Sequence, residues 1–225
     1  MPGARIARSS GTNIVRVGDF EHVTLSSTAW KRGDAKIVAR LSRERLITAA
    51  LDLLDEHGGD ALSMRALASR VDRQVSSLYN HVTSRDDLIE AIRARVVAGI
   101  DTGAFAEDDW DTALGAWARS YLTAFAAHPN AIQMLANTPI RDASTFDMYE
   151  RVVAALLAAG WPVSDAVAVM RTVEAHVLGS ALDIVAPEDL LDQTSVPPGH
   201  PAMHTALDPA LDGAFGARRA FELGL

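Results

Sequence analysis

The chain is 225 residues long, carries a formal net charge of −8 and is 48% hydrophobic, which is sufficient for a sizeable core. It contains no cysteine, which excludes disulfide bonds, a thiol nucleophile and a cysteine-based zinc site. No apolar run reaches the ~18 residues of a membrane span, and none of signal-peptide length follows the N-terminus, so we expect a cytoplasmic protein without a membrane partner.

Residues 1–41 show no clear period, and we predict that they form an N-terminal extension. They hold seven basic and three acidic side chains, whereas residues 99–225 hold six basic and seventeen acidic ones. A positive N-terminal end suits contact with nucleic acid, and an acidic C-terminal end does not. The extension is either a mobile tail or a basic arm that reaches phosphates. The arm would use Lys31, Arg32, Lys36 and Arg40.

The first strong helix is expected over residues 42–57, with Ser42 as its N-cap and Gly58-Gly59 at its end. A short helix capped by Ser63 follows, and a tight turn is predicted near Asp72 and Arg73.

The next helix is predicted over 74–81, with Val75, Leu78 and Val82 facing inward. Its other positions are occupied by Gln, Ser, Tyr, Asn and His. Such side chains can hydrogen-bond to base edges in the major groove of DNA. A further helix begins at Ser84, which forms a capping box with Asp87.

The stretch SMRALASRVDRQVSSLYNHVTSRDDLIEAI resembles the DNA-binding domain of the tetracycline-repressor-like (TetR) family of transcription regulators. The specific part is Leu-Tyr-x-His-Val at 78–82, with its offset from Arg-x-Leu-Ala at 65–68 and Ser-Arg-x-x-Leu at 84–88. One departure is Asp72, which stands where the family usually has Gly in the turn. Asp tolerates a left-handed backbone better than most residues.

The resemblance implies an all-α protein with a three-helix helix-turn-helix domain over 42–100 and a helical effector-binding and dimerisation domain over 101–225. It also implies a homodimer that binds a palindromic double-stranded DNA operator, represses by default and responds to an unidentified small-molecule effector. The residues at DNA-contacting positions of the family are Arg65, Gln74, Ser76, Ser77, Tyr79, Asn80, His81 and Arg85.

The C-terminal half is predicted to be helical. Helices are expected over 84–99, 110–127, 131–136, 145–159 and 164–185, with Ser164 capping the long one. His128-Pro129-Asn130 is expected to end the helix that starts at Trp110. Five prolines predict a loop over 187–209, and a last helix is expected from Asp208 or Pro209 toward Leu223.

The helices over 145–159 and 164–185 are apolar on more than one face, as helices with partners on two sides are. They fall where the resembled family has its dimerisation helices, which predicts a four-helix bundle between two subunits. The predicted interface residues are Val152, Val153, Leu156, Leu157, Val177, Leu178, Ala181 and Leu182.

A pocket for the effector is predicted from large adaptable side chains and two polar exceptions on the long helix. Its candidates are Trp110, Trp117, Tyr121, Phe125, Met134, Met170, Glu174 and His176. For each aromatic or Met residue an ordinary core position is the competing interpretation, and Glu174 could form a surface pair with Arg171. Tetracycline-binding members hold a magnesium–drug chelate through a His where Met134 stands here. Asp183 alone does not make such a site, so no metal, no cofactor and no tetracycline effector is expected.

An enzyme is not expected, because the sequence contains none of GxxxxGK[ST], GxGxxG, HExxH and GxSxG. His200 and His204 form an HxxxH pair, but within the Pro-rich stretch. The alternative function is a helical interaction or sensor protein of the same fold whose DNA binding is weak or lost. Asp72, Val75 and the acidic balance keep that alternative open.

Overall fold

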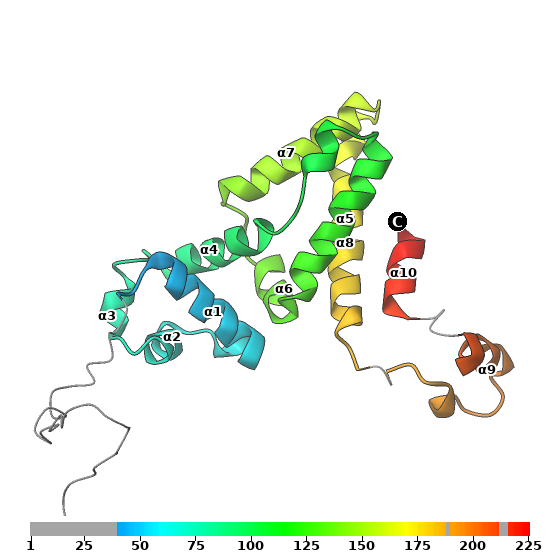
Figure 1. The fold of residues 1–225 in the computed structure, drawn as a ribbon, viewed down its shortest axis with the longest axis horizontal. Helices are drawn as coiled ribbons and strands as arrows, with labels where there is room; N and C mark the ends of the chain where they lie inside the picture. Colours follow the sequence, from blue (N-terminus) through cyan, green and yellow to red (C-terminus); the bar gives the residue numbers. More distant parts are fainter. Residues whose placement is uncertain (1–39, 188–189, 212–215) are drawn as a thin grey trace, which may run out of the picture. The chain divides into compact units, whose positions relative to one another are not determined.

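The computed structural model describes residues 40–187, 190–211 and 216–225, and every regular element within them is helical (Figure 1). The predicted all-α fold is confirmed. The predicted basic arm lies outside the described residues, except for Arg40. The α-helices are α1 (Arg43–His57), α2 (Met64–Arg70), α3 (Val75–Leu78), α4 (Arg85–Val97), α5 (Trp110–Ala126), α6 (Pro129–Ala136), α7 (Ala143–Ala158), α8 (Val163–Ile184), α9 (Pro201–Ala206) and α10 (Ala217–Gly224). Short 3-10 helices span Gly59–Ala61, Gly103–Ala106, Gln193–Ser195 and Pro209–Leu211.

Helices α1, α2 and α4 begin at the serine caps that the sequence indicates. The hydroxyl groups of Ser42, Ser63 and Ser84 each accept a hydrogen bond from the backbone N–H three residues later, at 3.2, 3.1 and 3.0 Å. Each bond satisfies one of the N–H groups that a helix start leaves without a partner. At the other end of α1, Gly58 adopts a φ of 79°, a conformation that favours glycine.

The turn between α2 and α3 contains Asp72 in the left-handed region, with a φ of 54°. The resembled family usually has a glycine at this position, and here Asp72 adopts the left-handed backbone conformation that the turn requires. Helix α3 ends at Leu78, three residues before the predicted end, because the next N–H groups bond to carbonyls three residues back. The His81 carbonyl instead accepts the Arg43 guanidinium at 2.6 Å.

The C-terminal helices differ from the prediction at several ends. Helix α5 ends just before His128, as expected, but α6 starts at Pro129 and not at Ala131, because the first position of a helix does not need the N–H that proline lacks. Asp142 caps α7, and Ser164 bonds to Asp165 rather than capping α8. The segment predicted as loop contains α9 and two 3-10 helices, and α10 starts only at Ala217.

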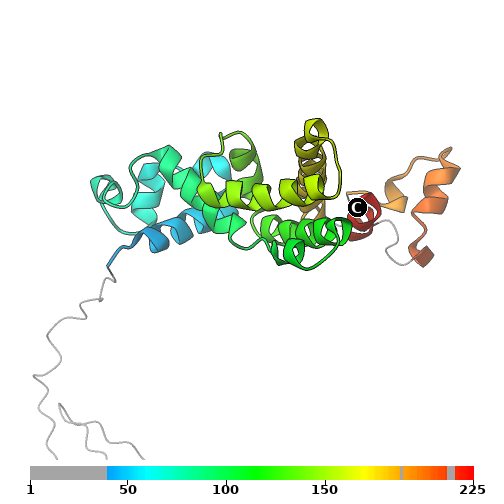
Figure 2. The same cartoon turned by 90° about the horizontal axis from the view of Figure 1, so that it is seen from above.

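Helices α5 and α8 pack along each other, and α7 and α10 both pack against α8 (Figures 1 and 2). Helix α4 contacts α1, α5 and α7, and helix α6 contacts α1, α5 and α8. Helices α4 and α6 therefore connect α1 with the C-terminal helices. No described helix is long and apolar enough to cross a membrane.

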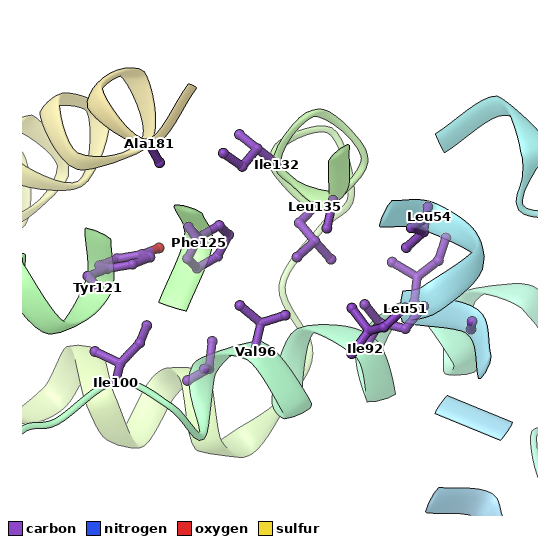
Figure 3. Close-up of a cluster of buried hydrophobic side chains, with 14 of the residues drawn as sticks. Leu51, Leu54, Ile92, Val96, Ile100, Tyr121, Phe125, Ile132, Leu135 and Ala181 are labelled. Carbon is purple, nitrogen blue, oxygen red and sulfur yellow. The ribbon is translucent and has the colours of Figure 1, made fainter. Parts of the chain in front are cut away.

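One buried cluster extends through these contacts. Figure 3 shows Leu51 and Leu54 of α1, Ile92 of α4, Leu135 of α6 and Phe125 of α5 in a continuous row. All five side chains are buried. Because buried side chains are closely packed, a displacement of α6 must be accommodated by α1, α4 or α5.

Candidate functional site

The helix-turn-helix is held by apolar side chains that face α1 and α4. Leu67 of α2, Leu78 of α3 and Val82 after it are almost completely buried. With its inward face anchored, the short α3 turns its remaining side chains outward. This is the arrangement that a helix inserted into a DNA groove requires.

The predicted DNA-contacting residues gather around this outward face. Six of them are exposed, and Ser77 and His81 are half-buried. Tyr79 retains 49% of its accessible surface, which is unusual for a large aromatic side chain. The exposed six are Arg65, Gln74, Ser76, Tyr79, Asn80 and Arg85.

The side chains of these six residues form no hydrogen bond or ion pair within the part of the chain that the structure describes. Other surface arginines nearby are committed, since Arg43 pairs with Asp87 and Arg70 pairs with Glu56. Arg65 and Arg85 therefore have their donors available for an external partner.

An ion pair that the sequence analysis did not identify fixes the end of α3. The Arg43 guanidinium donates to the Asp87 carboxylate at 2.7 Å and to the His81 carbonyl at 2.6 Å. Asp87 also accepts from the backbone N–H of Thr83 at 2.7 Å. The hydrogen bond from Arg43, with help from Thr83, lowers the pKa of Asp87 from 3.8 to about 2. No local signal could reveal this pair, because its members are 44 residues apart.

A buried polar junction joins α4 to the loop between α6 and α7. The Arg93 guanidinium donates to the carbonyl groups of Leu135 and Thr138, at 3.0 and 2.8 Å, and to Glu90 at 3.2 Å. The other carboxylate oxygen of Glu90 accepts from the backbone N–H groups of Arg141 and Asp142, at 2.7 and 2.8 Å. Arg93 is only 6% exposed, so these bonds lie out of water. In the sequence, Glu90 and Arg93 are an ordinary pair of charged residues three positions apart, so no pattern predicted that they would form a buried junction.

A cavity of about 280 Å³ lies beside this junction, with walls from α4, α5, α6, α7 and α8. Four predicted pocket residues line it, namely Tyr121, Phe125, Met170 and Glu174. The sequence analysis did not predict that Arg93, Tyr149 and Arg171 would also line it.

The other four predicted pocket residues do not line this cavity. Trp110 packs edge-on against Trp161, with ring centres 5.7 Å apart, and Trp117 is buried in the core. Met134 packs against the core outside the lining. His176 stacks on Phe221 and bonds to its carbonyl at 3.0 Å, which attaches α10 to α8.

The polar end of the cavity is a carboxylate with two phenols. The hydroxyl groups of Tyr121 and Tyr149 both donate to Oε1 of Glu174, the first at 2.7 Å. Burial, reinforced by the Glu174 carboxylate, raises the pKa of both tyrosines above the ordinary 10. Both phenols therefore stay protonated and act as donors.

Half of the predicted interface residues are covered by the chain's own helices. Val152, Leu156, Val177 and Ala181 are at most 1% exposed, so a second subunit cannot contact them. They were assigned to an interface because the periodicity of α7 and α8 does not distinguish a core within the subunit from one between subunits. Leu157 and Leu182 are exposed, and Val153 and Leu178 are half-buried.

Comparisons with known proteins assign this fold to a family. The family model described as "Tetracyclin repressor-like, C-terminal domain" matches residues 102–225, and the model described as "Bacterial regulatory proteins, tetR family" matches residues 46–92. The chain belongs to the TetR family. It is a DNA-binding transcriptional regulator by that membership, and the recognition drawn from the motif around Leu78 and Tyr79 is confirmed.

Two relatives of this TetR-family chain match it over most of their length. The class A tetracycline repressor from transposon 1721 of Escherichia coli is 31% identical over 84% of the chain and 88% of the relative. An HTH-type transcriptional regulator of Saccharopolyspora erythraea is also 31% identical, over 79% of the chain and 76% of the relative.

Solved structures of TetR-family proteins share the fold. A possible TetR family regulator from Streptomyces coelicolor A3(2) is 29% identical, with a TM-score of 0.68 over 81% of this chain and 94% of that one. ActR of Streptomyces coelicolor, solved with actinorhodin, is 26% identical with a TM-score of 0.66, over 83% of this chain and 93% of that one. BioQ, solved with its double-stranded DNA operator, is 26% identical with a TM-score of 0.55, over 64% of this chain and 86% of that one.

The described residues contain no group of three or more His, Asp or Glu side chains that could hold a metal ion. Asp183, considered above for a magnesium site, is an exposed residue near the end of α8. The cavity is lined by apolar side chains, two tyrosines, one threonine, one carboxylate and two guanidinium groups.

Proposed function

We propose that this protein is a ligand-responsive transcriptional repressor that binds a palindromic operator as a homodimer and is released by a small-molecule effector. The observation that carries the proposal is the outward face of α2 and α3, where exposed polar side chains have no partner among the described residues. A solved structure of the relative BioQ contains its operator, and one of ActR contains actinorhodin, which supports both a DNA-binding and a ligand-binding role here.

We assign the contacts by side-chain chemistry. Arg65 is suited to a bidentate hydrogen bond with guanine, and Asn80 to one with adenine. Tyr79, His81 and Arg85 are assigned to phosphates, which position the protein without reading sequence. Gln74, Ser76 and Ser77 complete the surface as smaller hydrogen-bonding contacts.

A second subunit is required because one four-residue helix offers few base contacts. Two such helices held about one DNA turn apart read a palindrome. The surface we assign to the partner is the exposed face of α8, where Ala168, Ala175, Gly179 and Leu182 follow one another at spacings of seven, four and three, which places them on one side of the helix. Leu157 extends this face onto α7.

Effector binding would reach the DNA-reading end through Arg93. The same α6 residue, Leu135, lines the cavity and gives its carbonyl to Arg93. A ligand that shifts α6 would therefore shift α4 and the helices packed on it. Such a ligand weakens DNA binding only to the extent that it prefers one of the two arrangements.

The test is fluorescence anisotropy of the full chain on a labelled duplex from upstream of its own gene, with a random duplex as reference and salt varied. We expect tight, salt-sensitive binding that Tyr79→Ala loses and that Arg95→Ala, an exposed arginine on α4, retains. Equal binding to both duplexes, followed by no enrichment in a random-library selection, would instead support a helical sensor with lost DNA binding.

A further inference from the structure

The carboxylate in the cavity has one oxygen that is not used by the protein. Both tyrosine hydroxyls converge on Oε1 of Glu174, and Oε2 receives no hydrogen bond from the described residues. Glu174 is half-buried and belongs to the cavity lining. Oε2 is therefore an available acceptor in a partly open cavity.

No cation of the described residues forms an ion pair with Glu174. Arg93 directs its guanidinium to Glu90 and to two carbonyl groups. Arg171 lies one turn earlier on α8, is exposed and makes no ion pair with Glu174 within 4 Å. A ligand that carries a positive charge would supply the ion-pair partner that Glu174 does not have among the described residues.

The Glu174 carboxylate and the two phenols offer a ligand acceptors rather than donors. The two phenol hydrogens are already given to Glu174, so what remains are the carboxylate and the hydroxyl oxygens. The neighbouring walls are apolar or aromatic, including Phe125, Ile132 and Leu178. Aromatic rings attract cations through their faces.

We propose that the cavity binds a small lipophilic ammonium cation, whose N–H groups donate to Oε2 of Glu174 and whose apolar body packs against α5, α6 and α8. This inference rests on the proposed function, since it names the chemical class of the effector for the same cavity. An organic acid would bring a second negative charge next to Glu174, and of the two arginines that line the cavity Arg93 is already bonded to Glu90 and to two carbonyl groups. A neutral ligand would leave the carboxylate without a counter-charge.

The test compares three probes with one apolar body: 4-phenylbutylamine, 4-phenylbutan-1-ol and 4-phenylbutyrate. They are cationic, neutral and anionic at neutral pH. Isothermal titration calorimetry with the full chain should give an affinity for the amine at least about tenfold above that for the alcohol, and the weakest binding for the acid.

Glu174→Gln keeps the shape and the acceptor for both tyrosines but removes the charge. We expect it to reduce the preference for amine over alcohol to within about threefold. Glu107→Gln, an exposed glutamate outside the cavity, should retain the full preference. A circular dichroism melt of both variants establishes that they are folded.

Three outcomes would overturn the inference: preference for the acid, an amine preference that survives Glu174→Gln, or no binding of the amine. None of them touches the proposed function. If the acid or another ligand releases DNA, the protein is still an effector-controlled repressor and only the effector class is wrong. Loss of operator binding in the anisotropy assay, by contrast, would contradict the function whatever the probes do.

Discussion

Asp87 is the residue on which the geometry of the DNA-reading end depends most directly. Its carboxylate accepts from Arg43 of α1 and from Thr83, and Arg43 in turn holds the carbonyl at the end of α3. Tyr79, Asn80 and His81 follow α3 directly, so these interactions of Arg43 and Asp87 fix the direction of their side chains. They also have a measurable pH signature.

Replacing Asp87 with Asn should lower the free energy of unfolding at neutral pH by about 1–2 kcal/mol, a range reduced for solvent screening because Arg43 is 47% exposed. The pKa of Asp87 is about 2 in the folded chain and 3.8 ordinarily, so its stabilisation is full above pH 3.8 and is lost as the pH falls toward 2. Urea titrations between neutral and acid pH measure this, with Asp86→Asn as the matched control. A gap between wild type and Asp87→Asn that is constant with pH would contradict the assignment.

Arg65 and Arg85 should differ in the kind of DNA binding they support. Arg65→Ala is expected to cost about 1–3 kcal/mol on the preferred operator and to relax specificity at one position, because it removes a base contact. Arg85→Ala is expected to weaken binding to all sequences and to reduce the salt slope by about one, because it removes a phosphate contact. Anisotropy on matched and mismatched duplexes at several salt concentrations separates them. The roles are reversed if Arg85→Ala changes the preferred sequence and leaves the salt slope unaltered.

At the scale of elements, the helix starts near the N-terminus were predictable and the long-range junctions were not. Ser42, Ser63 and Ser84 signal their helices within three residues, so a local pattern suffices. Arg93, by contrast, acts on carbonyl groups more than forty residues away, and a sequence pattern cannot show that contact. The same limit explains why only half of the predicted cavity residues line it. The spacing of apolar residues identifies the buried side of a helix, but it does not show which of the buried residues line a cavity.

Disrupting the buried junction between α4 and α6 should lower the free energy of unfolding more than disrupting an ion pair on the surface. Arg93→Ala leaves two carbonyl groups and the Glu90 carboxylate without their buried donor, and we expect a loss of about 2–4 kcal/mol in the free energy of unfolding. Arg119→Ala removes an ion pair with Glu222 whose side chains are 54% and 45% exposed, and should have little effect. Urea titration of both variants compares them directly. Equal, small effects would show that the junction contributes no more than a surface pair.

At the scale of the whole molecule, the proposed dimer depends on a face of α8 that a single subunit leaves exposed. Gly179 lies in the middle of α8, and a Cβ atom built there meets no atom of the chain within 4 Å. In a subunit alone, a side chain at this position would extend into solvent. In the proposed dimer it would extend into the partner, since helices that approach closely do so over small residues.

Gly179→Arg should therefore leave the fold of the subunit intact and abolish the dimer. Gly179→Ala is the matched control, because it adds only a methyl group and should stabilise the helix by up to about 1 kcal/mol. Analytical ultracentrifugation measures association, circular dichroism measures folding, and anisotropy on the operator should show affinity lower by about a hundredfold or more for Gly179→Arg, as two linked reading helices become one. If Gly179→Arg sediments as a dimer and binds the operator like wild type, the subunits must associate through another face, and the stripe on α8 must face solvent in the assembled repressor.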